Sequence, residues 1–258
     1  MSQRVVLVTG ASKRVGRAIA KRFAKDNYDV AVHYGASESE AAETVSAIQA
    51  VGRKAIALRA DLQSPDDIAA LVSHTYEKFG RLDVLVNNAA VFFSDHLGDF
   101  KVADLNRAWE VNCRAPILLM QAFYNQAKSR NQTGVVVNVV DQKIHDNFHP
   151  DDFSYTVSKV GIGNLTKMLA MSTTDVLQVN AIYPGLMAQS GDQTPEDFEY
   201  ARKRATLLGY VAGPEDVADA IVLLTLPSIN GVDFVVDAGQ NLKPVPHDVI
   251  SLYRAPKV

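Results

Sequence analysis

Cysteine is almost absent from this chain of 258 residues, which has only Cys113. A single cysteine rules out an intrachain disulfide framework and a cysteine-rich metal site, and it suits a reducing compartment. No apolar stretch reaches the length that spans a membrane, and the residues after Met1 lack the architecture of a signal peptide. We therefore expect a cytoplasmic protein that does not act at a membrane.

A large excess of charge of either sign is also lacking. The chain has 26 Lys plus Arg and 29 Asp plus Glu, which gives a formal net charge of -3. This balance offers no electrostatic reason to expect nucleic acid or an anionic membrane as a partner. The partners that we expect are small molecules and further copies of the same chain.

Short β-branched runs alternate with longer amphipathic segments along almost the whole chain, which is typical of β-α-β units around a parallel sheet. The sequence predicts an α/β fold, a single Rossmann-type domain over residues 1–243 with a seven-stranded, parallel, doubly wound sheet and helices on both faces. Helices are expected at 16–26, 103–129 and 153–172, and strands at 5–8, 30–34, 54–59, 82–87, 134–140, 177–182 and 233–237.

Two segments fall outside this regular pattern. The long polar loop at 185–196 follows a predicted strand and is a candidate for a lid over a substrate. The C-terminal tail, residues 244–258, carries Pro244, Pro246 and Pro256 and is expected to run over the surface or onto a neighbouring subunit.

Glycines mark the turn between the first predicted strand and the helix that follows it. The segment from Thr9 to Gly16 contains Gly10 and Gly16 at this strand-to-helix turn. Glycine there lets the backbone approach a pyrophosphate, which then binds free N–H groups at the helix N-terminus. A plain structural turn would use glycine too, but the position on the first β-α-β unit favours dinucleotide binding.

The end of the second predicted strand indicates which dinucleotide binds. Sites that prefer NAD usually place a carboxylate there for the ribose 2′-hydroxyl, whereas this segment reads His33-Tyr34-Gly35-Ala36-Ser37. Lys13 and Arg14 are nearby cations for a 2′-phosphate, with Ser37 adding a hydroxyl, unless the two cations are only solvated loop charges. The sequence therefore favours NADP(H).

Tyr155 and Lys159 are spaced four residues apart in a segment with a helical pattern, so they should share one helix face. Tyrosine normally has a pKa of about 10, and a neighbouring ammonium is expected to lower it by favouring the phenolate. Such a pair also occurs by chance on solvated helices. Together with the glycine turn, it indicates a tyrosine that exchanges a proton with a substrate.

With these pieces, the chain resembles the short-chain dehydrogenases/reductases from about residue 4 to 242. The matching segments are Thr9-Gly10…Gly16, Asp61, Asn87-Asn88-Ala89, Asn112, Tyr155 with Lys159, Asn180 to Gly185 and Val236 to Gly239. The resemblance implies that Tyr155 donates the proton, that Lys159 binds the nicotinamide ribose and polarises Tyr155, that Asn112 holds a water linked to Lys159, and that Asn88 braces the cleft. It also implies a homotetramer in which the helices at 103–129 and 153–172 pair across isologous interfaces.

The cofactor contacts expected from the turn and from the resemblance are Gly10, Lys13, Arg14, Val15, Gly16, His33, Tyr34, Ser37, Asp61, Leu62, Asn88, Ala89, Tyr155, Lys159, Pro184 and Gly185. For Asp61, an adenine contact and a place in the N-cap region of the next helix both remain open.

Two departures from the family pattern concern the substrate. Arg14 stands where most of the family has glycine, and Asp141 stands where most of it has serine. With Phe92, they resemble the pteridine reductases and the bacterial dihydromonapterin and dihydrofolate reductases. That likeness implies an arginine near the pterin, a stacking aromatic ring and an aspartate that takes part in proton delivery. The substrate contacts expected are Arg14, Phe92, Asp141, Tyr155 and Leu186.

Other interpretations of these residues stay open. Phe92 fits a core or interface position, and Asp141 fits a cap on the loop after its strand. The substrate is a dihydropterin or dihydrofolate, or else a ketone such as a 3-oxoacyl thioester, and an NADP-binding regulatory protein is a further class. No metal is expected, because His145 and His149 stand among three aspartates at irregular spacing.

Overall fold

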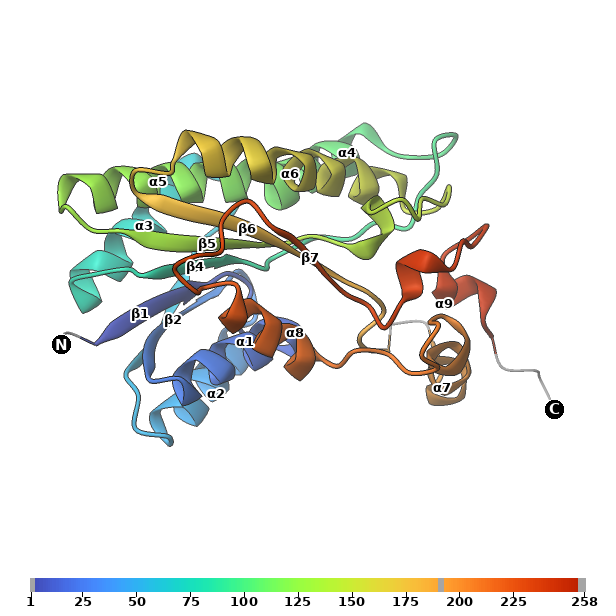
Figure 1. Ribbon diagram of the computed structural model, residues 1–258, viewed down its shortest axis with the longest axis horizontal. Coiled ribbons are helices and arrows are strands. Elements are labelled where there is room, and N and C mark those ends of the chain that lie inside the picture. Colours follow the sequence, from blue (N-terminus) through green and yellow to red (C-terminus); the bar gives the residue numbers. More distant parts are fainter. Residues whose placement is uncertain (1–2, 190–192, 255–258) are drawn as a thin grey trace.

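The computed structural model describes residues 3–189 and 193–254, and a single parallel sheet runs through them (Figure 1). Its strand order is β3-β2-β1-β4-β5-β6-β7, which confirms the predicted seven-stranded, doubly wound sheet. The strands are β1 (Arg4–Val8), β2 (Tyr28–Tyr34), β3 (Ala55–Arg59), β4 (Val84–Asn87), β5 (Gly134–Val139), β6 (Leu177–Pro184) and β7 (Asp233–Val236).

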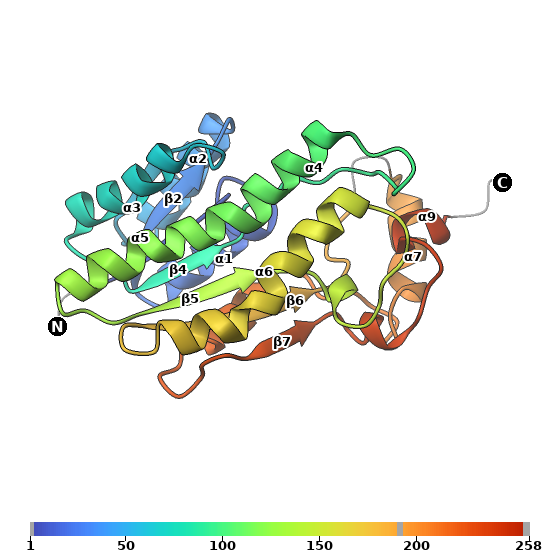
Figure 2. The same ribbon diagram turned by 90° about the horizontal axis from the view of Figure 1, so that it is seen from above.

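Helices cover both faces of the sheet, as the views in Figures 1 and 2 show. One face carries α1 (Arg14–Lys25), α2 (Glu38–Gln49) and α8 (Pro214–Leu223). The other carries α3 (Pro65–Phe79), α4 (Val102–Trp109), α5 (Ala115–Ser129) and α6 (Phe153–Ser172). Two further helices, α7 (Pro195–Arg204) and α9 (Val249–Leu252), lie together beyond the carboxyl ends of the strands.

The side-chain alternation of a strand divides the interior into two cores. In β1, Val5 and Leu7 pack with α3, α5 and α6, whereas Val6 and Val8 pack with α1, α2 and α8. All four side chains are buried, at 0–1% exposure, because a central parallel strand is covered on both faces. This explains why the first strand reads as an unbroken apolar run.

The strand order reverses between β1 and β4, and this places the site. Val8, at the end of β1, pairs with Val32 of β2 on one side and with Val86 of β4 on the other. The connections after β1 and β4 therefore leave in opposite directions and open a crevice at the carboxyl ends of the strands.

The predicted element boundaries differ from the observed ones by at most two residues. The helix predicted at 103–129 begins at Val102 and is interrupted by a π-helical turn, Glu110–Arg114, between α4 and α5. The helix predicted at 153–172 is α6 with the same bounds. Within the described part of the chain, no helix is long and apolar enough to cross a membrane.

The tail does not leave the domain. Within its described residues, up to 254, Val245 and Val249 pack against Ala205 beside Leu186 and Tyr253, and α9 lies next to α7. Residues 255–258, which include Pro256, lie outside the described residues. The tail thus forms a wall at the carboxyl end of the sheet.

Candidate active site

A cleft of about 1110 Å³ lies at the carboxyl ends of the strands. It is lined by the glycine turn after β1, the ends of β2 to β6, the start of the loop after β6, and the tail. Of the expected contacts, those that line the cleft are Gly10, Lys13, Arg14, Val15, Gly16, His33, Asp61, Leu62, Asn88, Ala89, Phe92, Asp141, Tyr155, Lys159, Pro184, Gly185 and Leu186.

The glycine turn needs its two glycines for different reasons. Gly10 has a φ of +63°, in the left-handed region that glycine adopts without a steric penalty. A Cβ on Gly16 would lie 2.2 Å from the carbonyl oxygen of Gly10 and 2.6 Å from Nδ2 of Asn88. Asn88 in turn donates from Nδ2 to the carbonyl of Thr9 at 2.8 Å. The turn is therefore packed directly against the loop after β4, and no other residue fits at position 16.

His33, on the neighbouring strand β2, holds this turn in place by hydrogen bonding. Its Nδ1 accepts a hydrogen bond from the backbone N–H of Gly10 at 3.1 Å, and its Nε2 lies 3.2 Å from the carbonyl of Ala60. Burial lowers the pKa of His33 to about 4, so the ring is neutral and Nε2 carries the proton. Although His33 lines the cleft, both ring nitrogens are engaged by the backbone, which makes it a support for the turn.

Part of the expected 2′-phosphate site differs from the prediction. Tyr34 and Ser37 do not line the cleft, and Tyr34 belongs to the core beside α1 and α2. The reason is that the chain turns after β2 so that Gly35 and Ala36 border the cleft. Arg59, at the end of β3, lines it as well, which sequence reasoning missed. A cation at the end of the strand paired with β2 was the available signal, because Arg59 lies in register with Tyr34.

Asp61 lines the cleft shortly after the end of β3. Its Oδ1 accepts a hydrogen bond from the backbone N–H of Gln63 at 2.9 Å. The N-cap of α3 is Ser64, whose side chain accepts from Asp67. Asp61 therefore shapes the turn before the helix, and a contact to adenine stays a prediction.

Arg14 shows why the family usually has glycine at this position. Its φ is 52°, a left-handed conformation that non-glycine residues seldom adopt. The guanidinium reaches across the cleft and donates to the carbonyl oxygen of Gln189 at 2.7 Å. The loop predicted as a lid is thus held to the glycine turn at Gln189, and its residues 190–192 lie outside the described residues.

Tyr155 and Lys159 lie one turn apart on α6 and both face the cleft. The hydroxyl of Tyr155 donates a hydrogen bond to Oδ2 of Asp141 at 2.9 Å. The ammonium of Lys159 donates to the carbonyl of Val139 at 2.8 Å and lies 5.6 Å from the centroid of the Tyr155 ring. The two side chains of the predicted pair therefore have separate partners: Tyr155 bonds to Asp141, which follows β5, and Lys159 bonds to the last residue of β5.

The electrostatics of this group differ from the sequence expectation for tyrosine. Loss of solvation raises the pKa of Tyr155 well above 10, and the carboxylate of Asp141 raises it further. The ammonium of Lys159 lies 5.6 Å from the ring centroid, and the net effect of the surroundings is to raise the pKa. The expected lowering of the tyrosine pKa is therefore outweighed by burial and by Asp141. Tyr155 is instead held protonated, which suits a proton donor.

The partners of Tyr155 are also shifted by burial. Burial lowers the pKa of Lys159 to about 8, while it raises the pKa of Asp141. Oδ1 of Asp141 accepts from the backbone N–H of Lys143 at 2.8 Å, so this aspartate also caps the short turn after its strand. Capping and contact with Tyr155 are thus combined in one residue.

Asn112 sits in the π-helical turn between α4 and α5. Its Oδ1 accepts from the N–H of Val91 at 2.8 Å, and its Nδ2 donates to the carbonyl of Val91 and to the hydroxyl of Ser158. The side chain thereby joins the loop after β4 to α6, next to Lys159. Single π turns within helices often occur at functional sites. The water expected at Asn112 stays a prediction.

Phe92 projects into the cleft above Tyr155. It is 54% exposed, and its ring centroid lies 4.9 Å from that of Tyr155. An exposed aromatic ring at the mouth of a cleft does not serve the core. It offers a flat apolar surface next to the hydroxyl of Tyr155 and the carboxylate of Asp141.

The tail adds to the site residues that the sequence did not indicate. Asp248, Val249 and Ile250 line the same cleft as Asp141 and Tyr155. No sequence motif predicted these residues, because they lie beyond the segments that resemble the family. They reach the cleft because the tail folds over α7.

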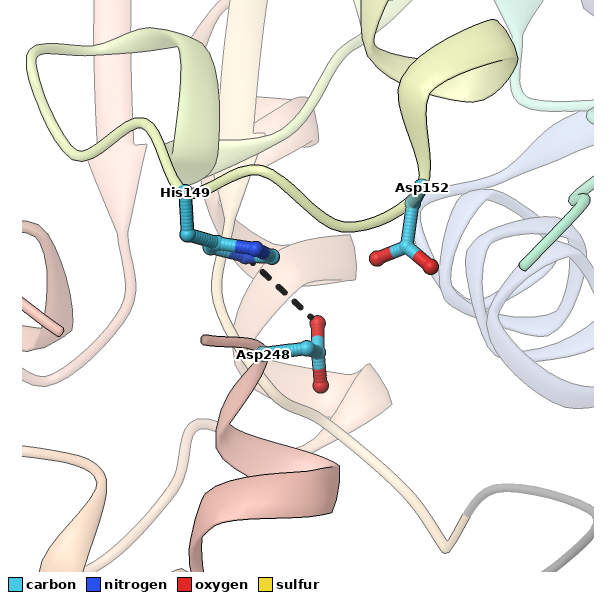
Figure 3. Close-up of side chains that lie close together, drawn as sticks. All are labelled: His149, Asp152 and Asp248. Atoms are coloured by element: carbon cyan, nitrogen blue, oxygen red, sulfur yellow. Dashed lines mark ion pairs between the residues drawn. The ribbon is translucent and has the colours of Figure 1, made fainter. Parts of the chain in front are cut away.

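A group of ionisable side chains borders the cleft behind Asp248. His149, Asp152 and Asp248 place their ligand-type atoms within 4.8 Å of one another (Figure 3). Burial lowers the pKa of His149 to about 4 and raises that of Asp152 to about 7. His145 is elsewhere, with its ring 5.5 Å from that of Tyr183.

Comparison with known proteins assigns the family. The model of the short chain dehydrogenase family matches residues 4–197, and the chain belongs to this family. It is an oxidoreductase of the short-chain dehydrogenase/reductase type. The catalytic roles of Tyr155 and Lys159 stay a prediction.

Named relatives differ in the reactions that their names describe. Glucose 1-dehydrogenase 2 of Bacillus subtilis is 32% identical over 95% of this chain and 97% of its own. The 3-oxoacyl-acyl-carrier-protein reductase of Staphylococcus aureus is 28% identical over 84% of this chain and 89% of its own.

A solved structure resembles the whole domain. FolM alternative dihydrofolate reductase 1 from Brucella canis, complexed with NADP, aligns with a TM-score of 0.87 and 32% identity, over 93% of this chain and 94% of that one. The chain thus resembles the dihydrofolate reductase branch of the family, and the NADP of this neighbour agrees with the cofactor expected from the sequence.

Proposed function

We propose that this protein is an NADPH-dependent reductase of a dihydropterin or dihydrofolate. The observation that carries the proposal is the hydrogen bond between Tyr155 and Asp141 in the cleft. Most of the family has serine at the position of Asp141, and a carboxyl group next to the catalytic tyrosine suits a ring nitrogen that has to gain a proton. The FolM neighbour supports this choice of substrate class.

The reaction reduces one C=N bond of the pterin ring. Bound NADPH supplies the hydride, which the ring carbon accepts, and NADP⁺ results. The neighbouring nitrogen gains a proton from Asp141, and in the same step the hydroxyl of Tyr155, which lies against Oδ2 of Asp141, passes its own proton to the aspartate. Solvent water then reprotonates Tyr155. Because its pKa is raised, Asp141 remains protonated to a higher pH than an ordinary aspartate.

The substrate is held by groups on opposite sides of the cleft. Phe92 stacks on the flat heteroaromatic ring, and Arg14 bonds to its oxo and ring-nitrogen edge from the glycine turn. Leu186 and Val249 close the apolar end. Arg14 exchanges its bond to Gln189 for the substrate, so the start of the lid loop responds to binding.

Reduction of a ketone is the second candidate function, because relatives of similar identity act on sugars or 3-oxoacyl thioesters by name. Oxidation of NADPH is measured with dihydrobiopterin, dihydromonapterin, dihydrofolate and an acetoacetyl thioester. A preference for one of the three pterins is the expected result. Turnover of the thioester alone would contradict the proposal and would show that the protein is a carbonyl reductase.

NADPH should bind more tightly than NADH. The end of β2 offers no carboxylate to a ribose 2′-hydroxyl, while Lys13 and Arg59 line that part of the cleft as cations. Titration of both nucleotides against protein fluorescence gives the two dissociation constants. The Arg59→Gln variant should narrow the ratio of the two dissociation constants. The control Arg53→Gln, at a residue that does not line the cleft, should leave that ratio unchanged. Equal constants for the wild type would contradict the assignment.

A homotetramer is the expected assembly. Large apolar side chains are exposed along α4 and α6, where Trp109 is 43% exposed, Met168 53% and Met171 79%. Isologous pairing of these helices would bury them. Light scattering at micromolar concentration should give four times the mass of the 28.1 kDa chain. A monomer would contradict the prediction.

We also propose a cytoplasmic location, which the single buried, free Cys113 supports.

A further inference from the structure

We propose that His149, Asp152 and Asp248 bind a divalent transition metal ion, for which Zn²⁺ is the best fit. No metal was predicted from the irregular spacing around His149, and Asp248 lies about a hundred residues further along the chain. In the fold, the loop before α6 and the N-cap of α9 meet (Figure 3). One ligand atom from each side chain lies within 4.8 Å of the other two, and Nε2 of His149 is 3.7 Å from Oδ2 of Asp248.

The surroundings of the His149 ring indicate a bound ligand. Its side chain is 3% exposed, and its Nδ1 has no hydrogen-bond partner. Its Nε2 faces Asp248 at a distance too long for a hydrogen bond. Buried polar groups nearly always have a partner, since an unpaired one costs about 1–3 kcal/mol. A metal ion on Nε2 would give this nitrogen a partner and would fix the N–H on Nδ1, which then points to Oδ2 of Asp151 at 3.5 Å.

The carboxylate of Asp152 is in a similar position. Its side chain is 5% exposed, and its contact in the structure is an ion pair at 3.8 Å with the ammonium of Lys143. Asp248 uses Oδ1 to accept from the backbone N–H of Ile250, which leaves Oδ2 toward His149. Each of the two carboxylates thus has an oxygen available to a cation.

Carboxyl groups outnumber cations around the cluster. Asp151, Asp152 and Asp248 are three carboxyl groups, and Lys143 forms an ion pair with Asp152. Burial raises the pKa of Asp152 to about 7 and also raises that of Asp248, so their charged forms are disfavoured without a further cation. Burying uncompensated charge is costly. A divalent cation neutralises this excess.

Asp151 supplies the support that metal-binding histidines usually have. Its Oδ2 lies 3.5 Å from Nδ1 of His149 and accepts the backbone N–H of Asp248 at 2.6 Å. A metal-bound histidine commonly directs its second ring N–H toward a carboxylate, which sets the orientation of the ring. Asp151 is placed to orient the His149 ring in this way, and it also holds the backbone of Asp248, which supplies another ligand.

The donor set selects the class of metal. One imidazole nitrogen and two carboxylate oxygens suit Zn²⁺, whereas Mg²⁺ and Ca²⁺ prefer oxygen alone. With bonds of about 2.0–2.2 Å, two ligand atoms on a tetrahedral Zn²⁺ lie about 3.3–3.6 Å apart. The ligand atoms, which lie within 4.8 Å of one another, therefore need to move together by up to about 1.2–1.5 Å. The ammonium of Lys143 opposes the metal, so we expect a micromolar dissociation constant.

The site would fasten the tail to the domain. Asp248 and the next two residues line the substrate cleft, whereas His149 and Asp152 belong to the loop before α6, which carries Tyr155. A metal ion between them would fix the distance from the tail wall to the catalytic helix. The metal ion would position the tail wall, and it would take no part in the reduction itself.

The test is calorimetric titration of the EDTA-treated full-length protein with Zn²⁺, without nucleotide or substrate. One Zn²⁺ per chain is expected for the wild type, and H149Q, D152N and D248N should each bind at least tenfold more weakly. Zinc also stabilises what it binds, so the melting temperature should rise in the wild type and not in H149Q. No uptake by the wild type in the micromolar range would overturn the proposal.

Exposed histidines supply the matched control. His96 and His247 both contact Asp151 from the outside, with side chains 53% and 58% exposed, and could bind zinc loosely. The double variant H96Q/H247Q should retain the site. Loss of binding in that variant, with binding retained in H149Q, would place the metal on the surface and overturn the proposal. A further readout is Co²⁺ in place of Zn²⁺, whose visible absorption should show tetrahedral coordination. Since no assay step uses a pterin, the outcome is independent of the proposed function.

Discussion

Replacing Tyr155 with phenylalanine should lower kcat about a thousandfold and leave the affinity for NADPH nearly unchanged. The hydroxyl is the only group removed, and it is held protonated against Asp141, so its loss removes proton supply to the substrate. A positioned acid or base contributes about 10²–10⁴-fold to a rate. The ring that packs below Phe92 remains, so the cleft keeps its shape.

Lys159→Ala is the contrasting variant. It should weaken NADPH binding and lower kcat together, because the resemblance to the family gives Lys159 a contact to the nicotinamide ribose. Stopped-flow measurement of hydride transfer and fluorescence titration of NADPH separate the two effects. Wild-type turnover in Tyr155→Phe on the best substrate would show that Tyr155 is not the acid.

The fold could be predicted almost completely from the sequence. The β-branched runs and the helical segments alternate without interruption, so each strand could be placed to within about two residues, and the glycine turn identified the first β-α-β unit. The π turn around Asn112 could not be foreseen. It changes the hydrogen-bonding of a helix without changing the apolar pattern that predicts the helix.

The site was less predictable where it depends on distant segments. The turn at Gly10 and the pair Tyr155 and Lys159 are local motifs, and the structure brings them to one cleft. The pKa of Tyr155 depends on how far its hydroxyl lies from Asp141 and Lys159, and spacing along a helix does not contain this information. Asp248 reaches the cleft only because the tail folds back over α7.

The variant that separates pterin from ketone reduction is Asp141→Ser. Serine is smaller than aspartate and keeps a hydroxyl that can form hydrogen bonds, but it is a far poorer acid. Pterin reduction should therefore fall on the order of a hundredfold or more in kcat/KM, within the range for loss of a positioned acid. Any ketone reductase activity should persist or rise, since serine is the residue that most of the family uses there.

Phe92→Ala is the parallel variant, and it should act on binding. Removal of the exposed ring takes away the stacking surface above Tyr155, so the KM for the pterin should rise while a small ketone is little affected. The matched control is Phe148→Ala, which removes an exposed ring that does not line the cleft and should change neither substrate class.

The pH profile gives Asp141→Ser a readout that a structural defect would not produce. Desolvation raises the pKa of Asp141, so its acid form, which delivers the proton, persists to a higher pH and is lost as the pH rises through that raised value. Wild-type kcat/KM for the pterin should therefore decline on the alkaline side, and the limb due to Asp141 should be missing in the serine variant. A separate decline near the pKa of Lys159, about 8 in the wild type, should move to lower pH in the serine variant, because the charge of Asp141 raises that pKa. Tyr155 adds no limb near neutrality, because its pKa lies well above 10. Undiminished pterin turnover in Asp141→Ser, or a wild type that reduces ketones alone, would leave the carbonyl reductase as the function of this chain.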